Sequence, residues 1–114
     1  MNIGELSSQV EHISANHASR FGITRDGDWH LLKLHEEVGE ATQAHLMRQG
    51  QARSKGLSPA QIDATFRAEA ADVLCHALLL ARHHDIDIVE EVRRKWLVWL
   101  EGSAAPDEVR PGQA

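Results

Sequence analysis

The stretch from Val73 to Ala81 limits most strongly how this chain can fold, because every residue in it except His76 is apolar. The segment before it carries clear signals for the start of a helix. Ser58 is a natural N-cap, Pro59 suits the first helical position, and Gln61 completes a capping box. A helix that is apolar nearly all round is buried on every side. Other helices, from the same chain or from a second copy, must therefore cover this helix.

The other segments also predict helices. Apolar residues at steps of three and four mark a helix near the N-terminus: Ile3, Leu6, Val10 and Ile13. We expect a second helix from Trp29 to about Met47, capped by Asp28, and a fourth from its cap Asp87 to roughly Glu101. The third lies between them and ends near His84. No stretch shows the alternation of a strand, so the sequence predicts an all-α bundle of about four helices.

We expect one domain over residues 1–102, followed by a disordered tail at residues 103–114, which is rich in proline, charged and small residues. Two arrangements would cover the apolar third helix. Either the first and fourth helices surround it within one chain, or a second copy of the chain covers one side. We favour the second arrangement, because a lone bundle of this size rarely encloses one of its helices completely. The sequence therefore predicts a homo-oligomer.

Composition excludes several classes of protein. The 114 residues have a formal net charge of -5, which argues against a nucleic acid polymer as partner. Cys75 is the single cysteine, so an intrachain disulfide and a CxxC motif are both excluded. The first residues lack the basic and apolar regions of a signal peptide, and no apolar stretch is long enough to span a bilayer. We therefore expect a cytoplasmic protein without a membrane partner.

The segment LHEEVGEATQA in the second helix places Glu36, Glu37 and Glu40 within five positions. Like charges one turn apart on a helix repel by roughly 0.2–0.5 kcal/mol per pair. We expect the core to be met by the apolar stripe of this helix: Leu31, Leu34, Val38, Ala41 and His45. On a helical wheel the three acids then form a patch away from the stripe, together with Lys33. Alone, such a patch is most often a solvated face.

A second acid pair changes this interpretation. Glu69 and Asp72 lie three residues apart in the third helix, directly before the apolar run, and His76 follows one turn later. A buried carboxylate is costly unless it is paired, protonated or bound to a metal. Two helices that each present an acid pair suit Mg²⁺, with Mn²⁺ as a possible substitute. His76 is compatible with donating to the acids or with a core position, and Trp29 with stacking on a base or with packing.

Together, KLHEEVGEA and EAADVLCHALLLA resemble the all-α nucleoside triphosphate pyrophosphohydrolase superfamily, known from MazG-like proteins. The hallmark of that family is EExxE, a variable spacer and ExxD. Here the spacer is residues 41–68, and the resemblance covers roughly residues 29–99. It implies a helical bundle that assembles as a homodimer or homotetramer. It also implies hydrolysis of a nucleotide substrate between its α and β phosphates, with release of a monophosphate and pyrophosphate.

The resemblance further implies roles for individual residues. The implied Mg²⁺ ligands are Glu37, Glu40, Glu69 and Asp72. Glu36 would bind a further metal ion or orient the attacking water, and Lys33 would contact phosphate. The expected catalytic residues are Glu36, Glu37 and Lys33. The expected substrate contacts are Lys33, Trp29, His76 and Lys95.

Two alternatives remain open. Phosphoribosyl-ATP pyrophosphatase, an enzyme of histidine biosynthesis, shares the KxxEExxE segment and the ExxD segment followed by a histidine, but usually has a shorter spacer. MazG-like chains often carry Lys, then Asn and a basic residue, along the last helix. Lys95 suits the first of these positions, whereas Trp99 and Gly102 hold the other two. The second alternative is therefore a non-catalytic helical dimer with a binding or regulatory role.

Overall fold

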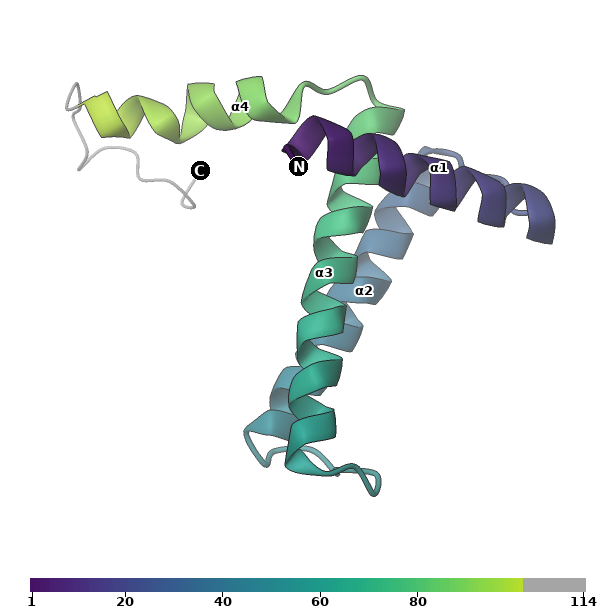
Figure 1. Cartoon of the computed structure of the whole chain (residues 1–114), viewed down its shortest axis with the longest axis vertical. Coiled ribbons are helices and arrows are strands. Elements are labelled where there is room, and N and C mark those ends of the chain that lie inside the picture. The colour runs from purple at the N-terminus through teal and green to yellow at the C-terminus, as the bar shows by residue number, and fades with distance from the viewer. Residues whose placement is uncertain (102–114) are drawn as a thin grey trace. The chain divides into compact units, whose positions relative to one another are not determined.

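The computed structural model describes residues 1–101. These residues contain four α-helices and no strand: α1 (Ile3–Phe21), α2 (Gly27–Arg48), α3 (Pro59–His83) and α4 (Ile88–Lys95). A short 3-10 helix, η1 (Leu97–Glu101), follows α4 (Figure 1). The prediction of an all-α chain is confirmed, and no helix within residues 1–101 has the length and apolar character needed to cross a membrane. The predicted disordered tail and Gly102 lie outside the described residues.

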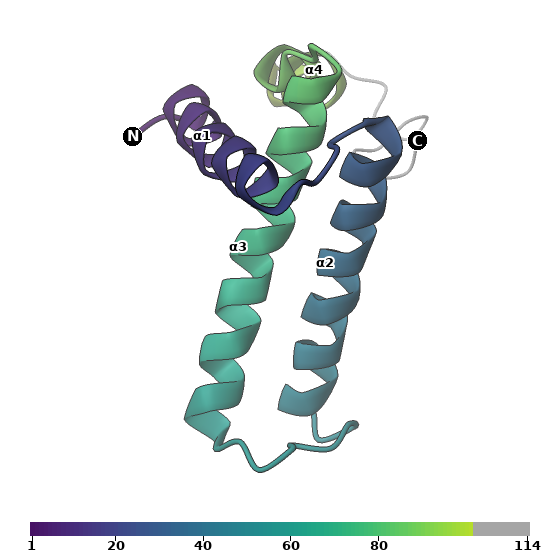
Figure 2. The ribbon, with the colours of Figure 1, turned by 90° about the vertical axis from the view of Figure 1, so that its right-hand side faces the viewer.

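The described residues divide into two compact units, residues 1–84 and residues 85–101. In the first unit α2 and α3 run side by side in opposite directions, joined by the loop of residues 49–58 (Figures 1 and 2). The first helix packs across the end of α3 that lies beside the start of α2, where Arg82 Nη1 donates to Ser7 Oγ at 3.4 Å. The α2–α3 pair therefore carries both acid segments. The expectation of one domain over residues 1–102 stays a prediction.

Side-chain caps fix where the helices begin. The predicted capping box of α3 is confirmed, because Ser58 Oγ accepts from Gln61 N at 3.2 Å and Gln61 Oε1 accepts from Ser58 N at 2.8 Å. The prediction for α2 is wrong by two residues. Asp26, and not Asp28, is the cap, since its carboxylate accepts from Trp29 N at 2.8 Å. Asp28 lies in the first turn, where its negative charge suits the positive end of the helix.

The fully buried residues of α2 are not those of the predicted apolar stripe, although Leu34 and Ala41 of that stripe are half-buried. The buried residues of α2 are His30, Glu37 and Ala44, with exposed fractions of 2%, 7% and 2%. Leu31 and Val38 are 46% and 44% exposed. The prediction that the stripe faces the core and the acids face away is therefore wrong for Glu37. Positions seven apart on a helix point in nearly the same direction, so one line of residues that includes Glu37 faces α3.

The core of the first unit is small and is built mainly on α3. Its buried apolar residues are Ala18, Ala44, Ile62, Leu78, Leu79 and Ala81. Within a single chain the stretch from Val73 to Ala81 is not buried on every side, because Leu74 is 46% exposed. Its burial by a second copy stays a prediction. The helices α1 and α2 pack on other sides of α3 and leave the side of Leu74 open. Leu74 and Val38 thus remain as exposed apolar surface of a single chain.

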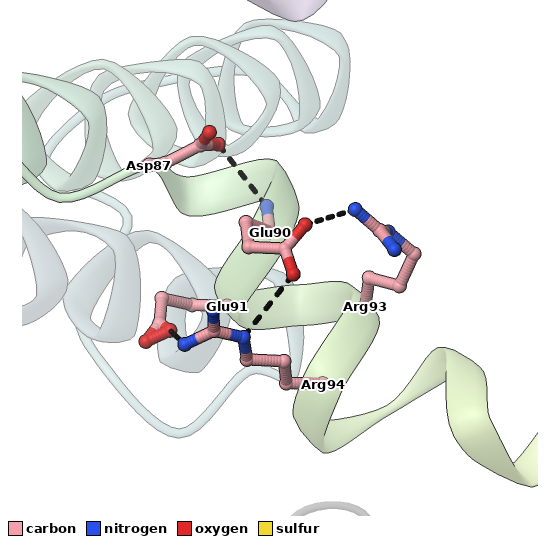
Figure 3. Close-up of polar contacts among 5 residues, drawn as sticks. All are labelled: Asp87, Glu90, Glu91, Arg93 and Arg94. Carbon is pink, nitrogen blue, oxygen red and sulfur yellow. Dashed lines mark hydrogen bonds and ion pairs between the residues drawn. The ribbon is translucent and has the colours of Figure 1, made fainter.

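In the second unit, charged pairs bind the turns of α4 together (Figure 3). Asp87 caps the helix as predicted, accepting from Glu90 N at 3.1 Å. The Glu90 carboxylate accepts hydrogen bonds from Arg93 and, at 3.1 Å, from Arg94 Nε. Such exposed pairs add only tenths of a kcal/mol each. The α-helix ends at Lys95 and η1 follows it, so the predicted continuous fourth helix is divided into two segments.

Candidate metal centre

Three carboxylates meet between α2 and α3. Glu37 and Glu40 come from α2 and Glu69 from α3, and one carboxylate oxygen of each lies within 4.8 Å of the other two. A spacing of three residues brings the two α2 acids to one side of their helix. The antiparallel packing of α3 brings the third acid to the same place. Both halves of the predicted acid motif thus contribute to one cluster.

Among the described residues, neighbouring groups satisfy two of these carboxylates only in part. Glu37 is buried and Glu69 half-buried, and the Oε2 atom of each is buried without a hydrogen-bond partner among the described residues. Burial, followed by the negative charges of Glu40 and Asp72, raises the pKa of Glu37 to about 7. Burial and the charge of Glu40 also raise the pKa of Glu69. The charge of Lys33 lowers the pKa of Glu37, so it compensates a part, but only a part, of the negative charge of this cluster.

A divalent cation fits the three acids. Carboxylate oxygens are ligands that Mg²⁺ prefers, and this ion completes its coordination with waters or substrate phosphates. The unpartnered oxygens of Glu37 and Glu69 would not have to break a hydrogen bond in order to bind a cation. A cation would also remove the repulsion that raises the pKa of both residues. The donor set thus suits Mg²⁺ or Mn²⁺.

Glu36 and Asp72, two further predicted ligands, are not among the three converging acids. Lys33 Nζ lies 3.3 Å from Glu36 Oε2 and 4.0 Å from Glu37 Oε1. The Glu36 side chain is 54% exposed, so its pairing with Lys33 contributes little to stability. Asp72 is exposed, and its charge raises the pKa of both Glu37 and Glu69. Asp72 therefore lies near the cluster, whereas Glu36 is directed to Lys33.

His76 borders the acids on α3. Its Nε2 atom lies 3.8 Å from Glu37 Oε1, and its ring meets the ring of Trp29 edge-on with centroids 6.3 Å apart. Burial lowers the pKa of His76, and the charge of Lys33 lowers it further. The neutral imidazole is therefore favoured, which can either donate to or accept from a neighbour. Its Nδ1 atom is buried without a hydrogen-bond partner within residues 1–101.

A mainly apolar cavity of about 380 Å³ adjoins the acids. Lys33 and His76, which contact Glu37, also line this cavity, as does Trp29. The remaining lining residues come from α1, the loop after it and α3: Val10, Ile13, Ser14, His17, Ile23, Cys75 and Leu79. Its volume falls in the usual range for small-molecule pockets, about 300–1,000 Å³.

The sequence does not predict that α1 lines this cavity. Ser14 and His17 follow the apolar residue Ile13 at one and four positions, which is ordinary for an amphipathic helix. That signal cannot mark a site by itself. The packing of α1 against α3 turns these residues into part of a cavity wall.

The last predicted substrate contact lies in the second unit. Lys95 is the final residue of α4 and is exposed. Trp99, at a position where the MazG-like pattern expects another residue type, is half-buried within η1. The role of Lys95 in substrate binding stays a prediction.

Comparisons of the chain with known protein families, with curated proteins and with solved structures find no match. The resemblance to MazG-like proteins therefore depends on the two acid segments and their surroundings. We infer function from these residues and from their geometry.

Proposed function

We propose that this protein is a Mg²⁺-dependent hydrolase that cleaves a nucleoside triphosphate, or a related nucleotide, between its α and β phosphates. The observation that supports this most directly is the convergence of Glu37, Glu40 and Glu69 from two helices, with two buried oxygens that lack a hydrogen-bond partner within residues 1–101. The order of the acids along the chain is that of the MazG-like motif. The cavity beside them has room for a nucleobase.

In this proposal Glu37, Glu40 and Glu69 hold the metal, and Lys33 and His76 connect these acids to the apolar cavity. A bound divalent cation neutralises phosphate charge, polarises the phosphoryl group and lowers the pKa of a water that can act as nucleophile. The acids alone would repel a polyphosphate, and the formal net charge of -5 offers no general attraction. The protein therefore depends on the cation for binding as well as for chemistry.

Lys33 and His76 have complementary tasks at the boundary between acids and cavity. The Lys33 ammonium lies between Glu36 and Glu37 and also lines the cavity, where it can donate to a phosphate oxygen. His76 and Trp29 present uncharged rings on the same wall, which suits a planar base. In the proposed binding mode the phosphates of the nucleotide point toward the acids and its base points toward α1.

The test is pyrophosphate release from a panel of nucleoside triphosphates and phosphoribosyl-ATP, with Mg²⁺, with Mn²⁺ and with neither. We expect release from at least one nucleoside triphosphate, dependent on the metal. Release from phosphoribosyl-ATP alone would favour the enzyme of histidine biosynthesis. If folded protein releases pyrophosphate from none of them, the non-catalytic helical dimer becomes the better interpretation.

We also propose that the active form is a homo-oligomer, because Leu31, Val38 and Leu74 leave apolar surface exposed on α2 and α3. We expect light scattering after gel filtration to give the mass of a dimer or tetramer. Val38→Glu should shift that mass toward the monomer, because a charge would be buried in the contact. Gln43→Glu adds the same charge at another exposed α2 position and is the control. A wild-type chain that elutes as a monomer at all concentrations would contradict the proposal.

A further inference from the structure

A second pocket, of about 230 Å³, lies where α1, the start of α2 and the end of α3 meet. All of its lining residues are titratable, and we call this set the basic pocket: Glu11, Arg25, His30, Arg82 and His83. None of them lines the apolar cavity or belongs to the acid cluster. This volume lies below about 300 Å³, the lower end of the range for pockets that bind drug-sized molecules. The basic pocket therefore suits a small ion.

The basic pocket has more positive than negative charge. Arg25 donates through Nη1 and Nη2 to the two carboxylate oxygens of Glu11, at 2.9 and 2.8 Å. Arg82 donates to Ser7 Oγ at 3.4 Å, and among the described residues no carboxylate lies within ion-pair distance of its guanidinium. One carboxylate thus faces two guanidinium groups. The basic pocket therefore has one unbalanced positive charge even when both histidines are neutral.

His30 forms the buried side of the basic pocket. It is 2% exposed, its ring lies 4.7 Å from that of His83 between centroids, and its Nδ1 atom has no hydrogen-bond partner among the described residues. Burial lowers the pKa of His30, and the positive charges of His83 and Arg25 lower it further, while Glu11 acts in the opposite direction. Positive neighbours therefore outweigh the one carboxylate at this ring, as an anion site requires.

The helix ends explain only half of this arrangement. Arg82 and His83 lie in the last turn of α3, where positive charge suits the negative end of a helix. Arg25 and His30 lie just before and within the first turn of α2, where the helix end is itself positive. Positive side chains at a positive helix end repel unless an anion lies between them. Asp26 and Asp28 supply negative charge at this end of α2, and Glu11 pairs with Arg25. The excess positive charge of the basic pocket therefore comes from Arg82, which has no carboxylate within ion-pair distance among the described residues.

We propose that the basic pocket binds a phosphate oxyanion, either free inorganic phosphate or the phosphoryl group of a larger molecule. Guanidinium groups match phosphate oxygens with paired N–H donors, and a protonated imidazole adds a further donor. Glu11 is occupied with Arg25 through both of its oxygens and so keeps that guanidinium in place at the pocket wall. Arg82 is the guanidinium free to turn toward the ligand.

The experiment is a titration of the full chain, freed of divalent metal, with inorganic phosphate and separately with a nucleoside monophosphate. The readout is the NMR shift of the assigned His30 and His83 ring protons. We expect saturable shifts with at least one probe and a rise in the pKa of His30 on binding, because a bound anion favours the charged ring. Arg82→Gln should weaken binding about tenfold, the value of one charged hydrogen bond.

Arg53→Gln is the matched control, since it removes the same charge in the loop at the other end of the α2–α3 pair. His83→Gln is a second variant, for use if Arg82→Gln does not fold. Saturation by phosphate assigns a free anion, whereas saturation by the monophosphate alone assigns a phosphoryl group. Absence of saturable shifts with both probes, or equal weakening by Arg53→Gln, overturns the proposal. Because metal is absent, neither result bears on pyrophosphate release.

Discussion

Glu40→Gln is expected to reduce pyrophosphate release by at least about 100-fold, because it removes one of the three converging acids that we propose as ligands of a catalytic metal. Glu40 is exposed, so a neutral amide of the same shape should cost the fold little. Without metal, the melting temperature should stay the same or rise. The charge of Glu40 raises the pKa of both Glu37 and Glu69, and its removal relieves that repulsion. Asp72→Asn should act in the same direction.

The measurement pairs steady-state pyrophosphate release with thermal unfolding in the presence of a chelator. Glu91→Gln makes the same chemical change at an exposed helical position of the second unit and should leave both quantities unchanged. Unfolding of both Glu40→Gln and Asp72→Asn would mean that the acids are structural. Full activity of Glu40→Gln in folded protein would exclude it as a ligand.

Local signals in the sequence are sufficient to locate most helix starts. Ser58 and Asp87 are caps in the structure. The side chain of each accepts a hydrogen bond from the backbone N–H of the residue three positions later. The signal fails at α2, where Asp26 and Asp28 flank Gly27 and both could cap. The sequence pattern cannot tell which of two aspartates so close together is the cap. In the structure the backbone of Asp26 is extended and its side chain caps α2.

The orientation of α2 could not be predicted from hydrophobicity. We assumed that Val38 marks the core, yet the helix pair meets along His30, Glu37 and Ala44. A line that contains a histidine and a glutamate has no apolar signature, because the site itself occupies the interface. The same fact explains why Glu37, Glu40 and Glu69 could be predicted as a group from their motif while their burial could not.

The stability of the metal-free protein is expected to fall as pH rises from about 4.5 to about 7, through Glu37. In the unfolded chain this carboxyl titrates near its ordinary value of 4.5, whereas burial and the charge of Glu40 raise its pKa to about 7 in the fold. Between these values the folded protein keeps a proton that the unfolded chain has released. The difference corresponds to on the order of 3 kcal/mol, which is lost in full above pH 7.

Other groups act in the opposite direction, so the comparison must isolate Glu37. Burial lowers the pKa of His30 and His76, and a lowered histidine pKa makes the fold gain stability as pH rises toward 6.5. Glu37→Gln removes only the carboxyl from this balance. Its free energy of unfolding should therefore fall less between pH 4.5 and 7 than that of the wild type, while the raised pKa of Glu69 acts in the same direction in both proteins. Parallel curves for the two proteins would contradict the assigned pKa of Glu37.

Mg²⁺ should reverse the trend in the wild type. A cation binds ionised carboxylates and must displace the proton that Glu37 holds below pH 7, so its stabilising effect should be larger at pH 7.5 than at pH 5. Each tenfold excess of ion over its dissociation constant adds about 1.4 kcal/mol. Glu37→Gln should gain less at either pH, because one of three ligands is gone. Chemical unfolding at both pH values, with Mg²⁺ and with chelator, measures all of these terms. Equal stabilisation of wild type and variant would place the ion elsewhere on the chain.

A loss of stability with rising pH in the absence of metal, and its recovery when metal is added, together distinguish a cation site from a solvated acidic face. Exposed acids titrate near their ordinary pKa and gain little stability from dilute Mg²⁺.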